Sequence, residues 1–242
     1  MQYRVVWDQP EPCPYLPERT ARLPLRLPLR VVTPEEFDRL LASGERRSGR
    51  LVYRTQCPGC DACHSLRVPV ERFVPTRSQE RAWKKNEGLL TVEMGPPALT
   101  REHLTLYNRH KIERGLARHD EPLSADAYRA WLVQTCTETV EVRYRLDGRL
   151  VAVSILDFGR TSASSVYHYF DPDEGRRSIG VYSVLKEIEI CRRSGIKWYY
   201  LGYYVEDCRH LSYKASYWPH ERRVDGVWTE FTAPGAAAGD GG

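Results

Sequence analysis

The hydrophobic and polar positions along the chain predict short strands and helices of ordinary length. Thr33, Pro34 and Glu36 form a capping box, which predicts the start of a helix. The basic stretch at residues 77–86 predicts a second helix, and we expect Ser78 to cap it. The N-terminal third of the chain is therefore expected to be structured, although it is rich in proline and arginine.

Strands are predicted at residues 51–54 and 66–70, where apolar residues recur. Pro69 cannot donate a backbone hydrogen bond, so we expect the second strand to lie at a sheet edge or to contain a bulge. The sequence Met94-Gly-Pro-Pro predicts a linker. We therefore expect three regions, which are a smaller basic, cysteine-containing N-terminal region at 1–92, a second domain at 93–232 and a disordered Gly/Ala-rich tail at 233–242.

The second domain is predicted to run helix, helix, strand, strand, strand, loop, helix, strand. Thr100 and Ser124 are expected to begin the two helices, and Asp147-Gly148 is expected to form a type I′ hairpin turn. A helix of about 15 residues is expected to end at Gly195. This order predicts a mixed α/β fold similar to that of the acetyltransferase (GNAT) superfamily.

The loop before that last helix contains a candidate anion-binding motif, Arg177-Ser-Ile-Gly180-Val-Tyr182. Backbone N–H groups and the helix dipole attract anionic oxygens at such a position. Arg177 and Gly180 fit the GNAT pattern Gln/Arg-x-x-Gly-x-Gly/Ala, but the bulky Tyr182 does not. This departure argues against coenzyme A and favours a tRNA 3′ end, with a plain surface turn as the alternative.

Positive charge is concentrated near the N-terminus. Residues 1–86 contain 16 of the 36 Lys and Arg residues but only 10 of the 32 Asp and Glu residues. This excess suggests a polyanionic or acidic ligand, with a solvated basic surface as the alternative. The sequence has neither a signal-peptide pattern nor an apolar run near the roughly 20 residues needed to span a bilayer. We therefore expect a cytoplasmic monomer with no membrane partner.

Four of the seven cysteines are candidate metal ligands. Cys57, Cys60 and Cys63 have Cys-x-x-Cys-x-x-Cys spacing, and Cys13 is a candidate fourth ligand. Four thiolates can bind zinc or an iron–sulfur cluster, whereas free or redox-sensitive thiols are the alternative. Structural disulfides are not expected in a cytoplasmic chain.

Seven motifs, taken together, resemble the arginyl/leucyl-tRNA–protein transferase family, and within it the bacterial aspartate/glutamate leucyltransferase type. The resemblance covers residues 10–232 and preserves the family's motif order. The motifs are Cys13-Pro-Tyr-Leu-Pro, Arg46-Arg-Ser-Gly-Arg-Leu-Val-Tyr-Arg54, Cys57-Pro-Gly-Cys60-Asp-Ala-Cys63, Arg77-Ser-Gln, Phe170-Asp-Pro, Arg177-Ser-Ile-Gly-Val-Tyr and Tyr200-Leu-Gly-Tyr-Tyr.

The resemblance implies an enzyme that moves leucine from Leu-tRNA, or arginine from Arg-tRNA, to the N-terminal amine of a protein beginning with Asp or Glu. The product would be marked for degradation by the N-degron pathway. No cofactor is required for this reaction, because the donor ester is already activated. Three other functions remain open, which are acetyl transfer from acetyl-CoA, Fem-like transfer to cell-wall precursors and RNA binding without catalysis.

The expected chemistry is aminolysis of an ester. An α-amine has a pKa near 7.7–8.0, so roughly a tenth or more is uncharged at neutral pH, and positioning can supply most of the rate. Backbone N–H groups near Tyr169 and Phe170 are candidates to stabilise the oxyanion. His168 and Asp171 are candidate proton carriers, although a histidine on a strand is more often only hydrogen-bonded.

Binding the acceptor's carboxylate requires a cationic side chain, and binding the tRNA phosphates requires several cationic side chains. Arg77, Arg81 and Lys85 lie four residues apart on one predicted helix face, and we expect Arg77 to bind the acceptor, with a solvated basic helix as the alternative. Candidates for the tRNA are Arg46, Arg47, Arg50, Arg176, Arg177, Gly180 and Tyr182. Tyr200 and Tyr203 are expected to line the pocket for the donor side chain, or else to pack in the core.

Overall fold

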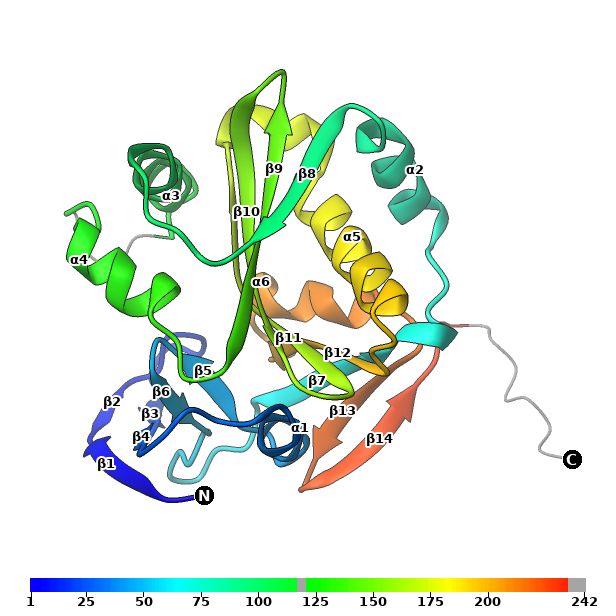
Figure 1. The fold of residues 1–242 in the computed structure, drawn as a ribbon. Coiled ribbons are helices and arrows are strands. Elements are labelled where there is room, and N and C mark those ends of the chain that lie inside the picture. The colour runs from blue at the N-terminus through cyan, green and yellow to red at the C-terminus, as the bar shows by residue number, and fades with distance from the viewer. Residues whose placement is uncertain (117–120, 235–242) are drawn as a thin grey trace, which may run out of the picture.

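An eight-stranded sheet forms the centre of the molecule (Figure 1). The structure is a computed structural model that describes residues 1–116 and 121–234. Neighbouring strands are antiparallel, except that β11 and β12 are parallel. In spatial order the strands are β14 (Val227–Phe231), β13 (His220–Val224), β7 (His64–Pro69), β12 (Trp198–Tyr204), β11 (Ser162–Phe170), β10 (Arg149–Phe158), β9 (Glu138–Leu146) and β8 (Leu90–Gly95).

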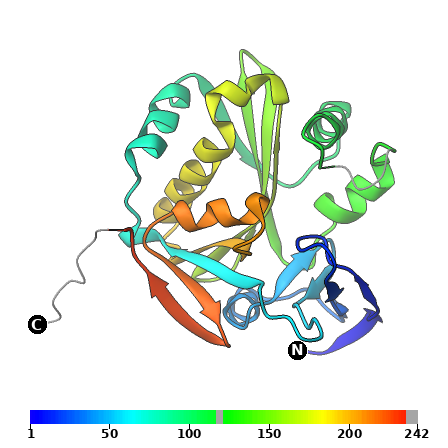
Figure 2. The ribbon, with the colours of Figure 1, turned by 180° about the vertical axis from the view of Figure 1, so that it is seen from behind.

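Helices cover both faces of this sheet (Figures 1 and 2). Helices α2 (Arg77–Asn86) and α5 (Ile179–Arg193) pack on one face. On the other face lie α3 (Arg101–Glu113) and α4 (Ala125–Tyr128), which continues as a π-helical turn at Arg129–Val133. Each face has its own apolar core. None of the helices in the described part of the chain is both long and apolar enough to cross a bilayer.

The remaining elements come from the first 53 residues and from the segments that connect the strands in the sequence. A four-stranded sheet packs beside α1, and a short helix, α6, follows β12. The four-stranded sheet has the order β1 (Tyr3–Trp7), β4 (Leu25–Pro28), β6 (Leu51–Tyr53) and β5 (Arg46–Ser48), next to a hairpin of β2 (Pro10–Pro12) and β3 (Thr20–Arg22). The helices are α1 (Pro34–Ala42) and α6 (Arg209–Ser212), and 3₁₀ turns span Val70–Arg72, Pro172–Arg177 and Tyr213–Ser216.

The local signals in the sequence account for most element ends. Thr33 caps α1 in a capping box with Glu36, as predicted. Thr100 and Ser124 cap α3 and α4, also as predicted. Helix α2 differs, because Thr76 rather than Ser78 is its cap and pairs with Gln79. The element order from α3 to β12 is the predicted one, so the predicted mixed α/β fold is confirmed.

Strand β7 corrects one expectation. It lies between β12 and β13, inside the sheet, and Pro69 is its last residue, opposite Trp198. The strand therefore tolerates proline because it ends there, and an edge position is wrong. Strand β8 spans the predicted boundary between residues 92 and 93, so the two predicted regions share one sheet. The predicted tail lies outside the described residues from 235 onward.

Candidate active site

A cavity of about 1170 Å³ opens where β11 and β12 part. These parallel strands pair from Ser162↔Trp198 to Ser164↔Tyr200, although β11 continues to Phe170 and β12 to Tyr204. A bulge lies in the same stretch of β11. On β10, Ile155 faces Tyr167 but Leu156 faces Ser165, so Val166 of β11 has no partner opposite it. The second half of β11 therefore forms a wall of the cavity.

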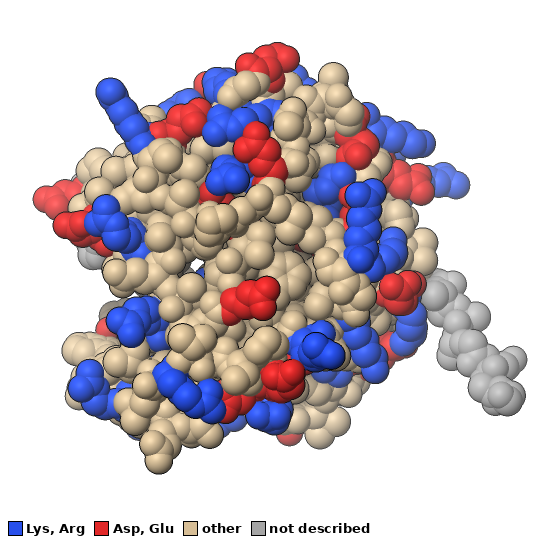
Figure 3. All heavy atoms as spheres, viewed as in Figure 1, with Lys and Arg blue, Asp and Glu red and all other residues tan. Residues whose placement is uncertain are grey.

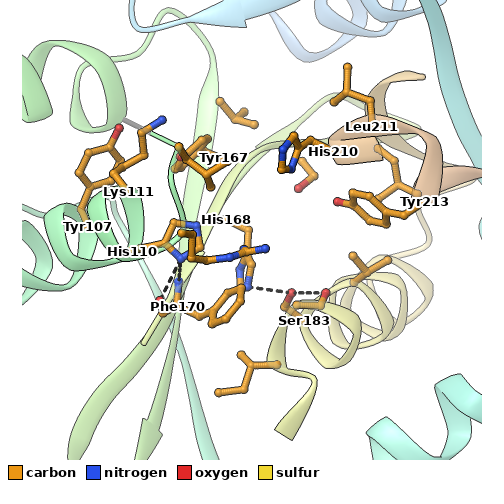
Figure 4. A pocket seen from close by; sticks show the side chains of 18 of the residues that line it. Tyr107, His110, Lys111, Tyr167, His168, Phe170, Ser183, His210, Leu211 and Tyr213 are labelled. Carbon is orange, nitrogen blue, oxygen red and sulfur yellow. Dashed lines mark hydrogen bonds between the residues drawn. The ribbon is translucent and has the colours of Figure 1, made fainter. Parts of the chain in front are cut away.

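Four other segments close the cavity. Side chains from α3 and α6 face each other across it, as Tyr107 and His210 do in Figure 4. The N-terminal turns of α5 form the floor, and Tyr15, Arg46 and Tyr53 come from the N-terminal region. In Figure 3 the surface is hollowed between the part carrying α3 and α4 and the part carrying the N-terminal strands. Both ends of the chain thus contribute to one site.

His110 closes the far end of β11. Its Nδ1 lies 3.0 Å from the backbone nitrogen of Phe170 and 2.9 Å from the backbone oxygen (Figure 4). Burial lowers the pKa of His110 to about 4, so the ring is neutral and accepts from the Phe170 N–H. The Tyr169 side chain points away from the cavity, where its hydroxyl lies 2.6 Å from that of Tyr128. The Phe170 N–H thus already has a partner and the Tyr169 side chain belongs to the core, while stabilisation of the oxyanion by backbone N–H groups near these residues stays a prediction.

His168 lines the cavity, as expected of a proton carrier, but its protonation does not suit that role. Its Nδ1 lies 2.9 Å from Ser154 Oγ and its Nε2 lies 3.4 Å from Ser183 Oγ. Burial, with smaller contributions from His110 and Arg114, lowers its pKa to about 3. The other candidate, Asp171, is buried against Arg149 and Arg109, outside the cavity. His168 is therefore a neutral, hydrogen-bonded wall residue.

Arg46 reaches into the cavity from β5. Its Nη2 donates to the backbone oxygen of Ser165, at 2.9 Å, just where β11 loses its β12 partner. Its Nη1 is buried and has no hydrogen-bond partner among the described residues. Gly202 makes room for it, because a Cβ there would lie 2.8 Å from Nη1. A guanidinium with one satisfied and one unsatisfied nitrogen thus faces the cavity.

Lys214 lies on the same side of the cavity and is buried. Its Nζ donates to the backbone oxygen of Tyr203, at 2.7 Å. Burial, with a smaller contribution from nearby Arg46, lowers the pKa of Lys214 to about 7. Tyr203 also lines the cavity, and its ring lies 5.9 Å from the Arg46 guanidinium, whereas its place in the donor pocket stays a prediction. Two cationic groups therefore converge near Tyr203.

Glu187, on α5, is the buried acid of the cavity. The Tyr199 hydroxyl donates to its Oε2, whereas its Oε1 has no hydrogen-bond partner among the described residues. Burial raises the pKa of Glu187 to about 7, although the hydroxyls of Ser154, Tyr199 and Ser165 lower it. A carboxyl group that titrates near neutral pH can accept a proton from an amine.

Several predicted site residues lie elsewhere. Arg47 is fully buried in an ion pair with Asp157 at 2.5 Å, so it cannot contact tRNA, and Arg50 is exposed outside the cavity. Tyr200 is buried on the other face of the sheet, where Arg67 donates to its hydroxyl at 3.1 Å. A place for Tyr200 in the donor pocket is therefore wrong.

The basic helix α2 also lies outside the cavity. Arg77, Arg81 and Lys85 share its exposed side, as predicted, but α2 packs against α5 on the opposite side from the cavity lining. Tyr182 faces α2 from α5 and is buried, with its hydroxyl 2.7 Å from Glu87. Tyr182 is therefore a packing residue, which corrects its assignment to tRNA binding.

The loop before α5 is only partly at the site. Gly180 lines the cavity, whereas Arg176 is exposed outside it and Arg177 pairs with Glu174 at 2.7 Å. Ser178 adopts a left-handed conformation, with φ 56°, and turns the chain into α5. The helix N-terminus thus faces the cavity, but the two arginines do not.

The N-terminal cysteines lie near one another. Burial and the nearby thiols of Cys57, Cys13 and Cys60 raise the pKa of Cys63 to about 12. Cys57, Cys60 and Cys63 line a second, smaller cavity of about 320 Å³. Within residues 1–116 and 121–234, no three His, Cys, Asp or Glu side chains are arranged to hold a metal ion. The zinc or iron–sulfur site at Cys13, Cys57, Cys60 and Cys63 therefore stays a prediction.

Sequence reasoning missed Lys214 and Glu187. Glu187 follows Ser183 by four residues and precedes Cys191 by four, so these three share the buried face of α5. A carboxylate on an otherwise apolar helix face is the signal that could have found it. Lys214 lies in a short turn with no such periodicity, and only the fold reveals its burial.

Comparisons with known proteins give one consistent family. Residues 11–81 match the family described as arginine-tRNA-protein transferase, N terminus, and residues 102–224 match its C terminus. The aspartate/glutamate leucyltransferase of Hahella chejuensis is 36% identical over 93% of this chain and 96% of its own. That of Aeromonas hydrophila is 37% identical over 89% of this chain and 90% of its own.

Solved structures show a weaker likeness. FemX superposes with a TM-score of 0.45 at 10% identity, covering 75% of this chain and 63% of FemX. L-PGS from Bacillus licheniformis superposes with a TM-score of 0.45 at 13% identity, covering 60% of this chain and 47% of that one. Values this low say nothing about substrates.

Proposed function

This chain belongs to the arginine-tRNA-protein transferase family, and from that premise we propose that it moves leucine from Leu-tRNA to proteins beginning with Asp or Glu. The family match covers both halves of the chain, and the curated relatives named above are aspartate/glutamate leucyltransferases. The chain is thus an aminoacyltransferase. Leucine as the donor residue, a cytoplasmic location and degradation of the product are parts of the proposal.

The observation that carries the proposal is the cavity between β11 and β12, which joins residues from both family regions. Its volume, about 1170 Å³, accommodates two reactants, namely an aminoacyl ester and a peptide N-terminus. Apolar side chains from several elements line it, which suits the side chain of leucine. These are Ile112, Leu116, Leu123, Val166, Ile179, Val184 and Leu211.

The reaction needs positioning more than strong acid or base catalysis. The ester of a charged tRNA is activated, and holding the amine against it removes much of the barrier. The N-terminus of α5, with Gly180 in its first turn, faces the cavity and favours an anionic group such as the terminal phosphate of the tRNA. The proposed roles therefore place the tRNA end at α5 and leave the Arg46 side for the acceptor.

The test is transfer of labelled amino acid to peptides that begin with Asp, Glu, Ala or Lys, each run with Leu-tRNA and with Arg-tRNA. We expect leucine on the Asp and Glu peptides only. Arginine on those same peptides would establish the arginyltransferase alternative instead. Transfer from neither tRNA, together with acetylation by acetyl-CoA, would overturn the proposal.

A further inference from the structure

Two cations without a carboxylate partner lie at one end of the cavity. Neither Arg46 nor Lys214 forms an ion pair with a carboxylate in the described part of the chain, whereas Arg47 and Arg67 nearby each have one. Arg46 Nη1 is also buried without any hydrogen bond. Burying a cation without an opposite charge costs free energy. An anionic ligand would therefore lower this cost for both side chains.

We propose that Arg46 and Lys214 bind the side-chain carboxylate of the acceptor's first residue, Asp or Glu. The inference rests on the proposed function and assigns its acceptor specificity. The Arg46 guanidinium offers a planar donor edge and the Lys214 ammonium a compact charge, and both suit a carboxylate. The helix α2, with its exposed Arg77, lies outside the cavity and is not needed for this recognition.

Glu187 and Arg46 both lie next to Ser165 of β11. Arg46 donates to the Ser165 carbonyl oxygen, and the Ser165 hydroxyl lies close to the Glu187 carboxylate. The charges at this end of the cavity thus complement an acidic N-terminal residue, whose carboxylate and ammonium are only a few bonds apart. Glu187 lines the same cavity and its buried Oε1 has no hydrogen-bond partner among the described residues, so the ammonium is assigned to Glu187.

The transfer step forms one amide bond and breaks one ester bond. The acceptor ammonium gives one proton to Glu187, and the neutral amine attacks the carbonyl carbon of the aminoacyl ester. The new C–N bond forms, and the C–O bond to the tRNA ribose breaks. The ribose oxygen leaves with the electron pair and takes up a second proton from the attacking nitrogen, which keeps the third as an amide hydrogen.

The preference for an acidic over an amide N-terminal residue is the quantity that tests the proposal. The experiment determines kcat/KM for peptides that begin with Asp, Asn, Glu or Gln, with the KM for Leu-tRNA measured alongside. The variants are Lys214→Met and Arg46→Gln, with Lys214→Arg as the charge-keeping partner. Arg72→Gln is the matched control, because Arg72 forms an exposed ion pair with Glu230 far from the cavity lining.

We expect Lys214→Met and Arg46→Gln to lower kcat/KM on Asp peptides by about 10-fold or more, as losing one charged hydrogen bond does. The Asn peptides and the KM for Leu-tRNA should change little. Lys214→Arg should keep the preference for Asp over Asn but alter the Asp-to-Glu ratio, since its side chain is longer. The Arg72→Gln control should match wild type.

Two results would overturn the inference. One is an unchanged Asp-to-Asn ratio in folded Lys214→Met and Arg46→Gln proteins, with folding checked by thermal unfolding. The other is equal loss on Asp and Asn peptides with a raised KM for Leu-tRNA, which would assign the two cations to tRNA phosphates. If Lys214→Met fails to fold, loss of the acid-over-amide preference in Lys214→Arg contradicts the proposal. Absence of transfer by the wild-type enzyme to any peptide would instead defeat the proposed function itself.

Discussion

Burial sets the protonation of the side chains that line the cavity. The pKa values of Glu187 and Lys214 both lie near 7, whereas that of His168 is about 3. Glu187 and Lys214 therefore titrate in the physiological range, and the histidine does not. At the residue scale, the groups able to move a proton are thus the acid and the lysine.

The titration of Glu187 should also make the free energy of unfolding depend on pH. Its pKa is about 7 in the folded protein and near 4.5 in the unfolded chain, so the folded state binds the extra proton between these values. The free energy of unfolding of wild type, relative to Glu187→Gln, should therefore be highest below pH 4.5 and fall by about 3 kcal/mol as pH rises past 7. Urea unfolding of both proteins across this pH range measures the difference.

The groups that face Glu187 keep their own protons over that pH range. They are Ser154, Ser165, Tyr199 and Cys191, with Tyr144, Tyr213 and Tyr217 nearby. Burial raises the pKa values of these tyrosines and of Cys191, so they stay neutral, and the pH-dependent difference belongs to Glu187. A constant difference between wild type and Glu187→Gln from pH 4.5 to 7.5 would contradict the assigned titration.

Adjacent arginines show why sequence alone could not define the site. Arg46 and Arg47 follow each other on β5, and successive side chains of a strand point to opposite faces. The sequence marks both as basic, but it does not tell which face meets the cavity and which meets Asp157. The same ambiguity separates Tyr203, at the site, from Tyr200, in the core.

Short sequence signals, such as helix caps and turns, predicted single helices and hairpins better than they predicted which strands pair. Caps and Asp-Gly turns act over four residues, so α1, α3 and the β9–β10 hairpin could be predicted. Strand β8 was missed, because Met94 and Gly95 also suit a linker and only pairing with β9 makes them a strand. The interior place of β7 depends on strands about 130 residues later, which no short window contains.

Packing of α2 on α5 provides a test at the element scale. The Tyr182 hydroxyl lies 2.7 Å from Glu87, and the Tyr182 ring packs 5.5 Å from that of Trp83. Tyr182→Phe should therefore lower the free energy of unfolding by about 1 kcal/mol, the usual value of one hydrogen bond, and leave the KM for Leu-tRNA unchanged. Chemical denaturation and steady-state kinetics measure the two effects. A raised KM for Leu-tRNA with an unchanged free energy of unfolding would instead support a role for Tyr182 in tRNA binding.

The whole molecule depends on contacts between its two family regions. Arg47 of β5 and Asp157 of β10 form a fully buried ion pair, and Thr139 donates to the same carboxylate at 2.7 Å. Arg46 and Lys214 likewise come from different regions and meet at one cavity. The N-terminal region is thus part of the enzyme's core and of its site.

Breaking the buried pair should destabilise the protein as a whole. Arg47→Met leaves Asp157 buried and unpaired, which should cost about 3–5 kcal/mol of the free energy of unfolding. The double variant Arg47→Met/Asp157→Leu should be more stable than Arg47→Met alone, because no uncompensated charge remains. Removing the exposed Arg72–Glu230 pair by Arg72→Gln should cost less than about 1 kcal/mol. Urea unfolding compares all three, and equal costs at the buried and exposed sites would show that Asp157 is solvated.

The interior position of β7 has a consequence for how the protein is made. On the ribosome β7 is complete long before its neighbour β12, since Val68 pairs with Tyr199 about 130 residues later. At about 5–20 residues per second, the nascent strand waits roughly 7–26 s for that partner. During this time Leu66, Val68 and Val70, all buried in the finished protein, have no sheet to join. Strand β7 thus reaches its place in the sheet only when translation is almost over.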